Sequence, residues 1–234
     1  MTVIWDLATR LFHWSLVILV STCLYTGLSG GLDEMDLHMV SGYGVLALLI
    51  FRLMWGFIGS KHARFFSFIV SPHRVWQYLR GLGNPSRHKQ PEAEYPLGHN
   101  PLGGYAIVAM IFLLLSQAVT GLFASDDIFI EGPLIHLVSY EQSRTLTGLH
   151  HLSSKLLMGL IALHLLAVAV HEILLKDRIV WPMITGRKQL PEKFATVTDT
   201  QHKPLMAIAL FTTASLSVYV IVDAVSYTHL RAHE

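Results

Sequence analysis

Hydrophobic positions along the chain fall into five long runs separated by polar connections. The runs cover about residues 10–28, 38–58, 102–124, 148–175 and 205–224. Each is close to the roughly 20 apolar helical residues that cross a hydrocarbon core about 30 Å thick. The pattern predicts an all-α integral membrane bundle, with a core of four helices and a fifth transmembrane helix added at the end.

Composition agrees with a membrane location. Only 14% of the residues are charged, whereas soluble chains carry about 25%. The single cysteine, Cys23, lies inside the first run, so the sequence has neither a disulfide framework nor a Cys-x-x-Cys-His motif for covalent haem attachment. The flank MTVIWDLATR is poorly basic and no small-residue cleavage site follows the first run, so we expect that run to be a retained helix rather than a signal peptide.

Lysine and arginine are concentrated in two of the four connections. They follow the second and fourth runs, at Lys61, Arg64, Arg74, Arg80, Arg87, Lys89, Lys176, Arg178, Arg187, Lys188, Lys193 and Lys203. The other two connections are mainly acidic, with Asp33, Glu34, Asp36, Asp126, Asp127, Glu131 and Glu141 against Arg144. The positive-inside rule then places the N-terminus and the two basic connections on the cytoplasmic side of the membrane, with the acidic connections on the opposite side.

The long basic connection contains a further helical pattern. In FSFIVSPHRVWQYLRGL, apolar residues recur at helical spacing at Val75, Tyr78, Leu79 and Leu82. This predicts a short helix in the membrane interface, and an ordinary surface helix is the alternative. Downstream, Asn100 and Pro101 supply a cap and a first-turn proline for the third span.

Four histidines lie within the apolar runs, at His13, His38, His150 and His164. Ionisable side chains inside a membrane are costly, and they usually face the bundle interior and carry function. Consecutive spans run in opposite directions. The start of the first span therefore shares a leaflet with the end of the fourth, which pairs His13 with His164. The starts of the second and fourth spans share the other leaflet, which pairs His38 with His150.

The spacing within the fourth run supports these pairs. His150 and His164 are fourteen residues apart, which returns to nearly the same helix face and rises about 21 Å. Two imidazoles on one iron make a six-coordinate haem suited to electron transfer. The pattern predicts two b haems at two depths. His171 is the rival inner ligand, about 31 Å from His150, and His151 points about 100° away from its neighbour.

Several nearby residues are candidates for contacts to the cofactor. Arg52 lies fourteen residues after His38, at the depth of the inner pair, where it would meet haem propionates or a quinone. Arg10 and Lys155 would also pair with propionates, and snorkelling to the interface is their alternative role. Gly42 would leave room for a porphyrin, although small residues also serve helix packing.

Four motifs carry a resemblance to a known family. They are RLFHW at 10–14, LHMVSGYGVL at 37–46, YPLGHNPLGG at 95–104 and GLHHLSSKLLMGLIALHLLAVAVHEILLKD at 148–177. Through them, about residues 3–190 resemble the bacterial cytochrome b561 and nickel-iron hydrogenase cytochrome b family. The resemblance implies a membrane dihaem cytochrome b whose ligands fall on His13, His38, His150 and His164. It also suggests a cytochrome domain at 1–190, followed at 191–234 by a linker, the additional transmembrane helix and a short polar tail.

The expected function is electron transfer between the quinone pool and a redox partner, either a c-type cytochrome or a hydrogenase-like protein. Contacts with the quinone or the redox partner would form at the inner end, near Arg10, Arg52 and His99, or at the acidic loop with Asp126, Asp127 and Glu131. A superoxide or small-oxidant oxidoreductase of the same fold is one alternative. A divalent metal transporter is another, but the spans carry hardly any acidic residues and show no repeat. We expect membrane lipid and no nucleic acid as partners. Whether the chain forms a homodimer and whether the tail SYTHLRAHE is native stay open.

Overall fold

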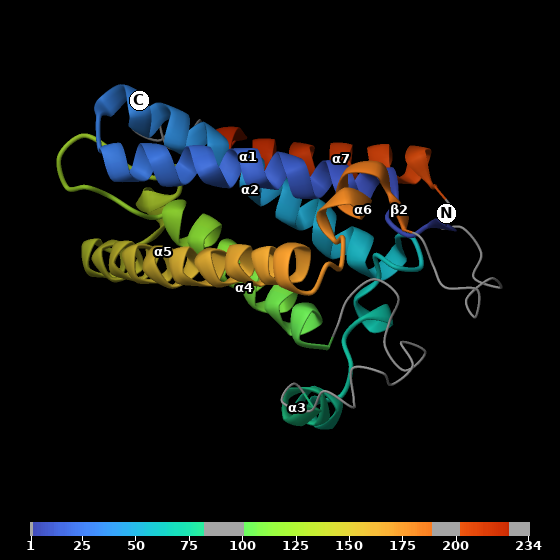
Figure 1. The fold of residues 1–234 in the computed structure, drawn as a ribbon. Helices are drawn as coiled ribbons and strands as arrows, with labels where there is room; N and C mark the ends of the chain where they lie inside the picture. The colour runs from blue at the N-terminus through green and yellow to red at the C-terminus, as the bar shows by residue number, and fades with distance from the viewer. Residues whose placement is uncertain (1, 82–100, 189–201, 225–234) are drawn as a thin grey trace.

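A computed structural model of the chain describes residues 2–81, 101–188 and 202–224. Within these ranges, five helices are long and apolar enough to cross a membrane. They are α1 (Leu7–Ser29), α2 (Leu32–Ile58), α4 (Pro101–Gly121), α5 (Tyr140–Ala169) with its π-helical continuation η5 (Val170–Leu174), and α7 (Pro204–Tyr219) with its π-helical continuation η7 (Val220–Ala224) (Figure 1). The expected all-α membrane bundle is confirmed.

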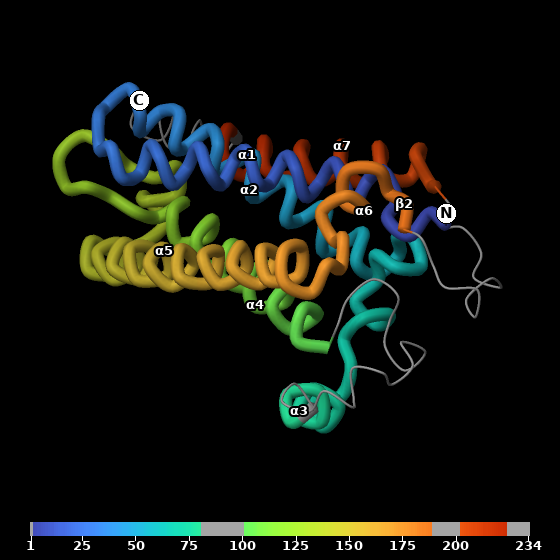
Figure 2. Tube along the Cα trace, viewed as in Figure 1, coloured from blue at the N-terminus to red at the C-terminus, as the bar shows by residue number. Residues whose placement is uncertain are grey.

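The connections collect at two ends of the bundle. The N-terminus, α3 (Pro72–Gly81), α6 (Val180–Thr185) and β2 (Arg187–Lys188) lie at one end, and the segments that join α1 to α2 and α4 to α5 lie at the other (Figures 1 and 2). We call these the N-terminal end and the loop end. The predicted antiparallel order of the first four spans is therefore present, and the acidic connections lie at the loop end.

Two helices begin earlier than the hydrophobic pattern suggested. α2 starts at Leu32 and α5 at Tyr140, so His38 and His150 lie inside their helices rather than at their starts. A capping box causes the early start of α5. The Gln142 amide N–H donates to Ser139 Oγ at 3.3 Å, and the Ser139 amide N–H donates to Gln142 Oε1 at 2.9 Å. Polar first turns of this kind precede the apolar part of a helix and are not detected by hydropathy.

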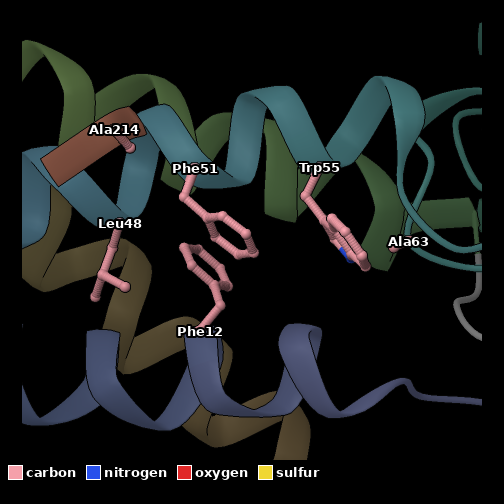
Figure 3. Packing of buried hydrophobic residues seen from close by; sticks show 6 residues of the cluster. All are labelled: Phe12, Leu48, Phe51, Trp55, Ala63 and Ala214. Atoms are coloured by element: carbon pink, nitrogen blue, oxygen red, sulfur yellow. The ribbon is translucent and has the colours of Figure 1, made fainter. Parts of the chain in front are cut away.

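Aromatic packing joins α1, α2 and α7. The rings of Phe12 and Phe51 lie 6.5 Å apart between their centroids, and Phe51 stacks on Trp55 at 5.8 Å (Figure 3). Ala214 of α7 is fully buried in the same cluster as Leu48 of α2. The fifth helix therefore packs mainly against α2, outside the part of the bundle that contains α5.

A second cluster connects α2 to the pair formed by α4 and α5. Val45 and Leu49 of α2 pack with Ile111 and Leu114 of α4, and Leu157 of α5 completes the cluster. α5 packs mainly along α4 and is the least buried of the five spans. α5, which carries both His150 and His164, is thus positioned by α4 on one side and faces α1 and α2 on the other (Figure 1).

The segment after α5 folds back onto the start of α1. β1 (Thr2–Val3) pairs antiparallel with β2, a two-residue exception to the all-α expectation. Arg10 donates through Nη1 to the Ile184 carbonyl at 2.6 Å, and Trp14 donates through Nε1 to the Met183 carbonyl at 3.1 Å. These contacts hold the start of α1 against α6.

The predicted interfacial segment is helical, because α3 covers Pro72–Gly81. The guanidinium of Arg80 lies 4.7 Å from the Trp76 ring centroid, a cation–π contact on the helix surface. Leu82, Asn100 and His99, together with the tail 226–234, lie outside the described residues. Two single-turn 3₁₀ helices, η1 (Phe65–Ser67) and η4 (Ile135–Leu137), complete the connections.

Candidate functional site

Two histidines from different helices meet near the loop end. The ring centroids of His38 on α2 and His150 on α5 are 6.2 Å apart, with an angle of 73° between the ring planes. Both side chains are half-buried. The structure therefore brings together the pair that the antiparallel order of the spans predicts.

His38 lies against the backbone of α1. Its Nδ1 is 3.0 Å from the carbonyl oxygen of Cys23 and 3.2 Å from Oγ1 of Thr26. A Cβ atom added at Gly27 would come within 3.0 Å of Cε1 of the ring. The imidazole therefore occupies the space that a side chain at this position would need.

His150 lies against α4 in the same way. Its Nδ1 is 3.0 Å from the carbonyl oxygen of Gln117 and 3.3 Å from Oγ1 of Thr120. A Cβ atom added at Gly121 would come within 3.1 Å of the ring Cε1. Thr26, Gln117 and Thr120 could not be singled out from the sequence, because the Thr-Gly pair at 26–27 and 120–121 also occurs at 147–148 and 185–186.

The side chain of Gln117 contacts the opposite nitrogen of His150. Its Nε2 is 2.9 Å from Nε2 of the imidazole, and its Oε1 accepts a hydrogen bond from Ser153 Oγ at 2.5 Å. A metal bound at this imidazole nitrogen requires the amide group of Gln117 to turn away. Its backbone carbonyl can stay where it is.

The second predicted pair is less tightly held. His13 on α1 and His164 on α5 are both half-buried. Nδ1 of His13 is buried and has no hydrogen-bond partner among the described residues, and the ring lies edge-on to Trp14 at 5.1 Å between centroids. A buried nitrogen without a partner is uncommon in a folded protein, and such a group needs an explanation.

Arg52 on α2 is buried, with 4% of its surface exposed. Its guanidinium lies 4.9 Å from the Phe65 ring centroid and 6.0 Å from that of Phe12. Nη1 has no hydrogen-bond partner among the described residues. A buried cation with an unused donor is suited to bind an anionic group.

Asp6 organises a buried polar network at the N-terminal end. Its carboxylate caps α1 by accepting from the Thr9 amide at 2.7 Å and from Thr9 Oγ1 at 2.9 Å. It also accepts from Trp55 Nε1 at 3.4 Å and from the Ser60 hydroxyl. The sequence analysis missed this residue, although Asp followed three positions later by Thr before an apolar run is a typical N-cap signal.

The other predicted contact residues have different surroundings. Arg10 donates to the Ile184 carbonyl, and its buried Nε has no partner among the described residues. Lys155 is exposed on α5. A Cβ added at Gly42 would meet no atom within 4 Å, so no described protein atom requires a glycine there. Cofactor contacts by these three residues stay predictions.

The rival ligand His171 takes part in a different interaction. Its Nδ1 lies 3.4 Å from Oδ2 of Asp177, which also pairs with Lys188 at 3.6 Å. His151 is exposed, with its ring 6.2 Å from that of His150. Over the described ranges, no group of three or more His, Cys, Asp or Glu side chains is arranged to hold a metal ion.

Two titratable groups outside the spans have shifted pKa values. Hydrogen bonds from the backbone N–H groups of Ile130, Ile128 and Phe129 lower the pKa of Asp126. This carboxylate, which the sequence analysis assigned to partner docking, is therefore engaged within its own loop. Burial, with a smaller effect from the Lys61 charge, lowers the pKa of His62.

Comparison with known proteins identifies relatives of this chain. The family described as prokaryotic cytochrome b561 matches residues 4–186. A protein of Rhizobium leguminosarum bv. viciae named probable Ni/Fe-hydrogenase B-type cytochrome subunit is 23% identical over 219 residues, covering 81% of this chain and 90% of its own. The protein of the same name from Azotobacter chroococcum is 27% identical over 218 residues, covering 78% and 86%.

A third relative, from Escherichia coli strain K12, is named probable Ni/Fe-hydrogenase 1 B-type cytochrome subunit. It is 21% identical over 229 residues, covering 85% of this chain and 94% of its own. No solved structure gives a significant match. The family match includes α1, α2, α4 and α5, which carry all four histidines. The chain therefore belongs to the prokaryotic cytochrome b561 family, and it is a multi-pass membrane cytochrome b that transfers electrons.

Proposed function

We propose that this chain passes electrons between membrane quinones and a redox partner through two b haems. His38 and His150 would hold one haem near the loop end, and His13 and His164 would hold the other near the N-terminal end. The observation that carries the proposal is the approach of His38 and His150 from two helices that are not consecutive in the sequence.

The chemistry of His38 and His150 fits an iron porphyrin. The ring centroids of His38 and His150 are 6.2 Å apart, so both imidazoles could supply nitrogen ligands to the iron of one haem. In both rings Nδ1 lies against a backbone carbonyl. That contact leaves Nε2 as the nitrogen that can bind a metal, once the Gln117 amide has moved from His150.

Different observations support a second haem at the N-terminal end. The partnerless Nδ1 of His13 is a buried polar atom that protein groups do not satisfy. His164 lies about 21 Å along α5 from His150. Arg52 adds a buried cation with an unused donor at this end, which would pair with a haem propionate or a quinone oxygen.

The role of the protein is to hold the ligands and to keep water away from them. A haem with two histidine ligands exchanges one electron at a time and has no open coordination position. α5 supplies one ligand at each depth, so both sites share one rigid element. The aromatic cluster around Phe12, Phe51 and Trp55 is buried and surrounds the N-terminal site with apolar side chains.

The names of the relatives favour a hydrogenase-like partner, because the three relatives described above are named as Ni/Fe-hydrogenase cytochrome subunits. A c-type cytochrome stays a second choice. For the topology, we propose a bacterial inner membrane with the N-terminal end in the cytoplasm, because the basic connections gather at that end. Reporter fusions at the loop between α4 and α5 and after α3 would test this orientation.

Haem analysis of the purified full-length protein tests the proposed function. We expect a reducible Soret band and α band, and about two b haems per chain in a pyridine haemochrome assay. Addition of decylubiquinol or menadiol under anaerobic conditions should reduce the haem. A preparation without a reducible Soret band would refute the cytochrome function, and one haem per chain would refute the second site.

A further inference from the structure

We propose that Thr26–Gly27 on α1 and Thr120–Gly121 on α4 are two equivalent clamps that position His38 and His150 as Nε2 ligands of the haem at the loop end. The inference rests on the proposed function, and it assigns positioning roles to residues one helix away from each ligand. Each clamp consists of a carbonyl oxygen, a threonine hydroxyl and a glycine within two turns of helix.

The contacts of the two clamps match atom for atom. On α1 the carbonyl belongs to Cys23, the hydroxyl to Thr26 and the glycine is Gly27, at positions i, i+3 and i+4. On α4 the same positions are Gln117, Thr120 and Gly121. The distances agree within 0.1 Å, since Nδ1 lies 3.0 Å from each carbonyl and 3.2 or 3.3 Å from each hydroxyl.

The contacts determine which ring nitrogen carries the proton. A carbonyl oxygen can only accept a hydrogen bond, so Nδ1 of each histidine must be the donor. The threonine hydroxyls donate backwards along their own helices, from Thr26 to the Thr22 carbonyl at 2.8 Å and from Thr120 to the Ser116 carbonyl at 2.6 Å. Each hydroxyl therefore offers a lone pair to Nδ1–H, and Nε2 keeps the lone pair that a metal requires.

The glycines determine how closely each ring approaches the helix. An alanine Cβ would lie 3.0 Å from Cε1 of His38 or 3.1 Å from Cε1 of His150, which is closer than ordinary van der Waals contact. The ring would have to shift by a few tenths of an ångström and lose its alignment with the carbonyl. Gly27 and Gly121 therefore permit the hydrogen bond that Thr26 and Thr120 support.

The arrangement is specific to one end of the bundle. The five-residue segments are CLYTG at 23–27 and QAVTG at 117–121, and each lies in the helix that precedes its histidine-bearing helix. His13 shows the opposite situation, because its Nδ1 is buried and has no partner among the described residues. Hydrogen bonds of this type orient a ligating histidine and increase its basicity. The loop-end site is thus the one whose two ligands are aligned by the protein.

Threonine variants test the electronic part of the proposal in the haem-loaded full-length protein. Thr26→Val and Thr120→Val should raise the midpoint potential of the loop-end haem and shift its low-temperature EPR signal, because Nδ1–H loses an acceptor and the imidazole becomes a weaker electron donor. Thr26→Ser and Thr120→Ser should restore both values. Thr213→Val on α7 is the matched control, since the Thr213 hydroxyl donates to the Ala209 carbonyl in the same way but on an exposed face.

Glycine variants test the steric part. Gly27→Ala and Gly121→Ala should weaken haem binding at the loop end by about 10- to 100-fold, the usual cost of disturbing such outer contacts, while the other haem is kept. Gly159→Ala is the control on α5, because a Cβ there meets no atom within 4 Å. Haem per chain is counted after equilibration against apomyoglobin as a haem acceptor.

The outcomes separate this proposal from the proposed function. Wild-type protein with two haems, and threonine and glycine variants with unchanged potential, EPR signal and haem retention, would overturn the clamps alone. Wild-type protein without haem would refute the proposed function. The clamps are then judged by the imidazole ¹⁵N shifts of His38 and His150, where Nδ1–H in wild type and mixed tautomers in Thr26→Val and Thr120→Val support them, and identical shifts overturn them.

Discussion

Replacing Asp6 with alanine should destabilise the protein far more than the loss of one surface charge would. The Asp6 carboxylate is 2% exposed, caps α1, and accepts hydrogen bonds from Trp55 and Ser60 near the end of α2. Loss of an N-cap costs about 1 kcal/mol. A buried donor left without an acceptor costs about 1–3 kcal/mol, with the longer Trp55 contact at the low end.

Together these effects predict a loss of about 3–5 kcal/mol in the free energy of unfolding for Asp6→Ala. Asp6→Asn should lose less, because the amide oxygen can still accept from the Thr9 amide. Asp36→Ala is the control for a charge on the surface, since Asp36 is exposed on α2, and its effect should stay within about 0.5 kcal/mol.

The free energy of unfolding can be measured by SDS titration of the protein in mixed micelles, followed by tryptophan fluorescence and by haem absorbance. Both signals should give the same transition, shifted to lower SDS for Asp6→Ala. A loss smaller than about 1 kcal/mol in the free energy of unfolding would contradict a stabilising role of the Asp6 hydrogen bonds, because loss of the cap alone accounts for that amount. An equal loss in Asp36→Ala would show that overall charge, rather than burial, is responsible.

Four further expectations follow from the site and its surroundings. His150→Ala should leave about one haem per chain with the loop-end haem lost, and His164→Ala should lose the other; retention of both haems after either change refutes the pairing. Arg52→Gln should lower the midpoint potential of the N-terminal haem in a redox titration, because removal of a nearby positive charge favours the ferric form; an unchanged potential argues against contact with a propionate. Burial lowers the pKa of His62 from 6.5, so below that pH the unfolded state binds more protons than the folded state. The contribution of His62 to the free energy of unfolding is therefore complete above about pH 6.5, and the protein loses stability as the pH drops below that value. His62→Gln should reduce that acid sensitivity in thermal unfolding measured between pH 7 and 5, and identical pH profiles refute the assignment. Gln117→Leu should keep the loop-end haem, because the backbone carbonyl and not the amide aligns His150; loss of that haem shows that the side chain is needed.

Hydropathy and helical periodicity were enough to predict much of the site. The five spans, their antiparallel order and the approach of His38 to His150 depend on local sequence and on the thickness of a bilayer, which apolar run lengths reflect directly. The earlier starts of α2 and α5 were missed, because their first turns are polar and are stabilised by caps rather than by lipid. The short pairing of β1 with β2 was also missed, since it joins Thr2 and Val3 to Lys188 and Arg187, which are far away in the sequence.

Local sequence patterns were sufficient to predict the five long apolar helices and the approach of His38 to His150. The packing of the helices in three dimensions sets which backbone carbonyls His38 and His150 face, and it places Arg52 against Phe12 and Phe65 with an unused donor. It also decided that Arg10 is engaged by the Ile184 carbonyl. These contacts depend on the rotation of each helix about its axis and on the separation between helices. Both are set by side-chain packing between segments far apart in the chain, which no local pattern records.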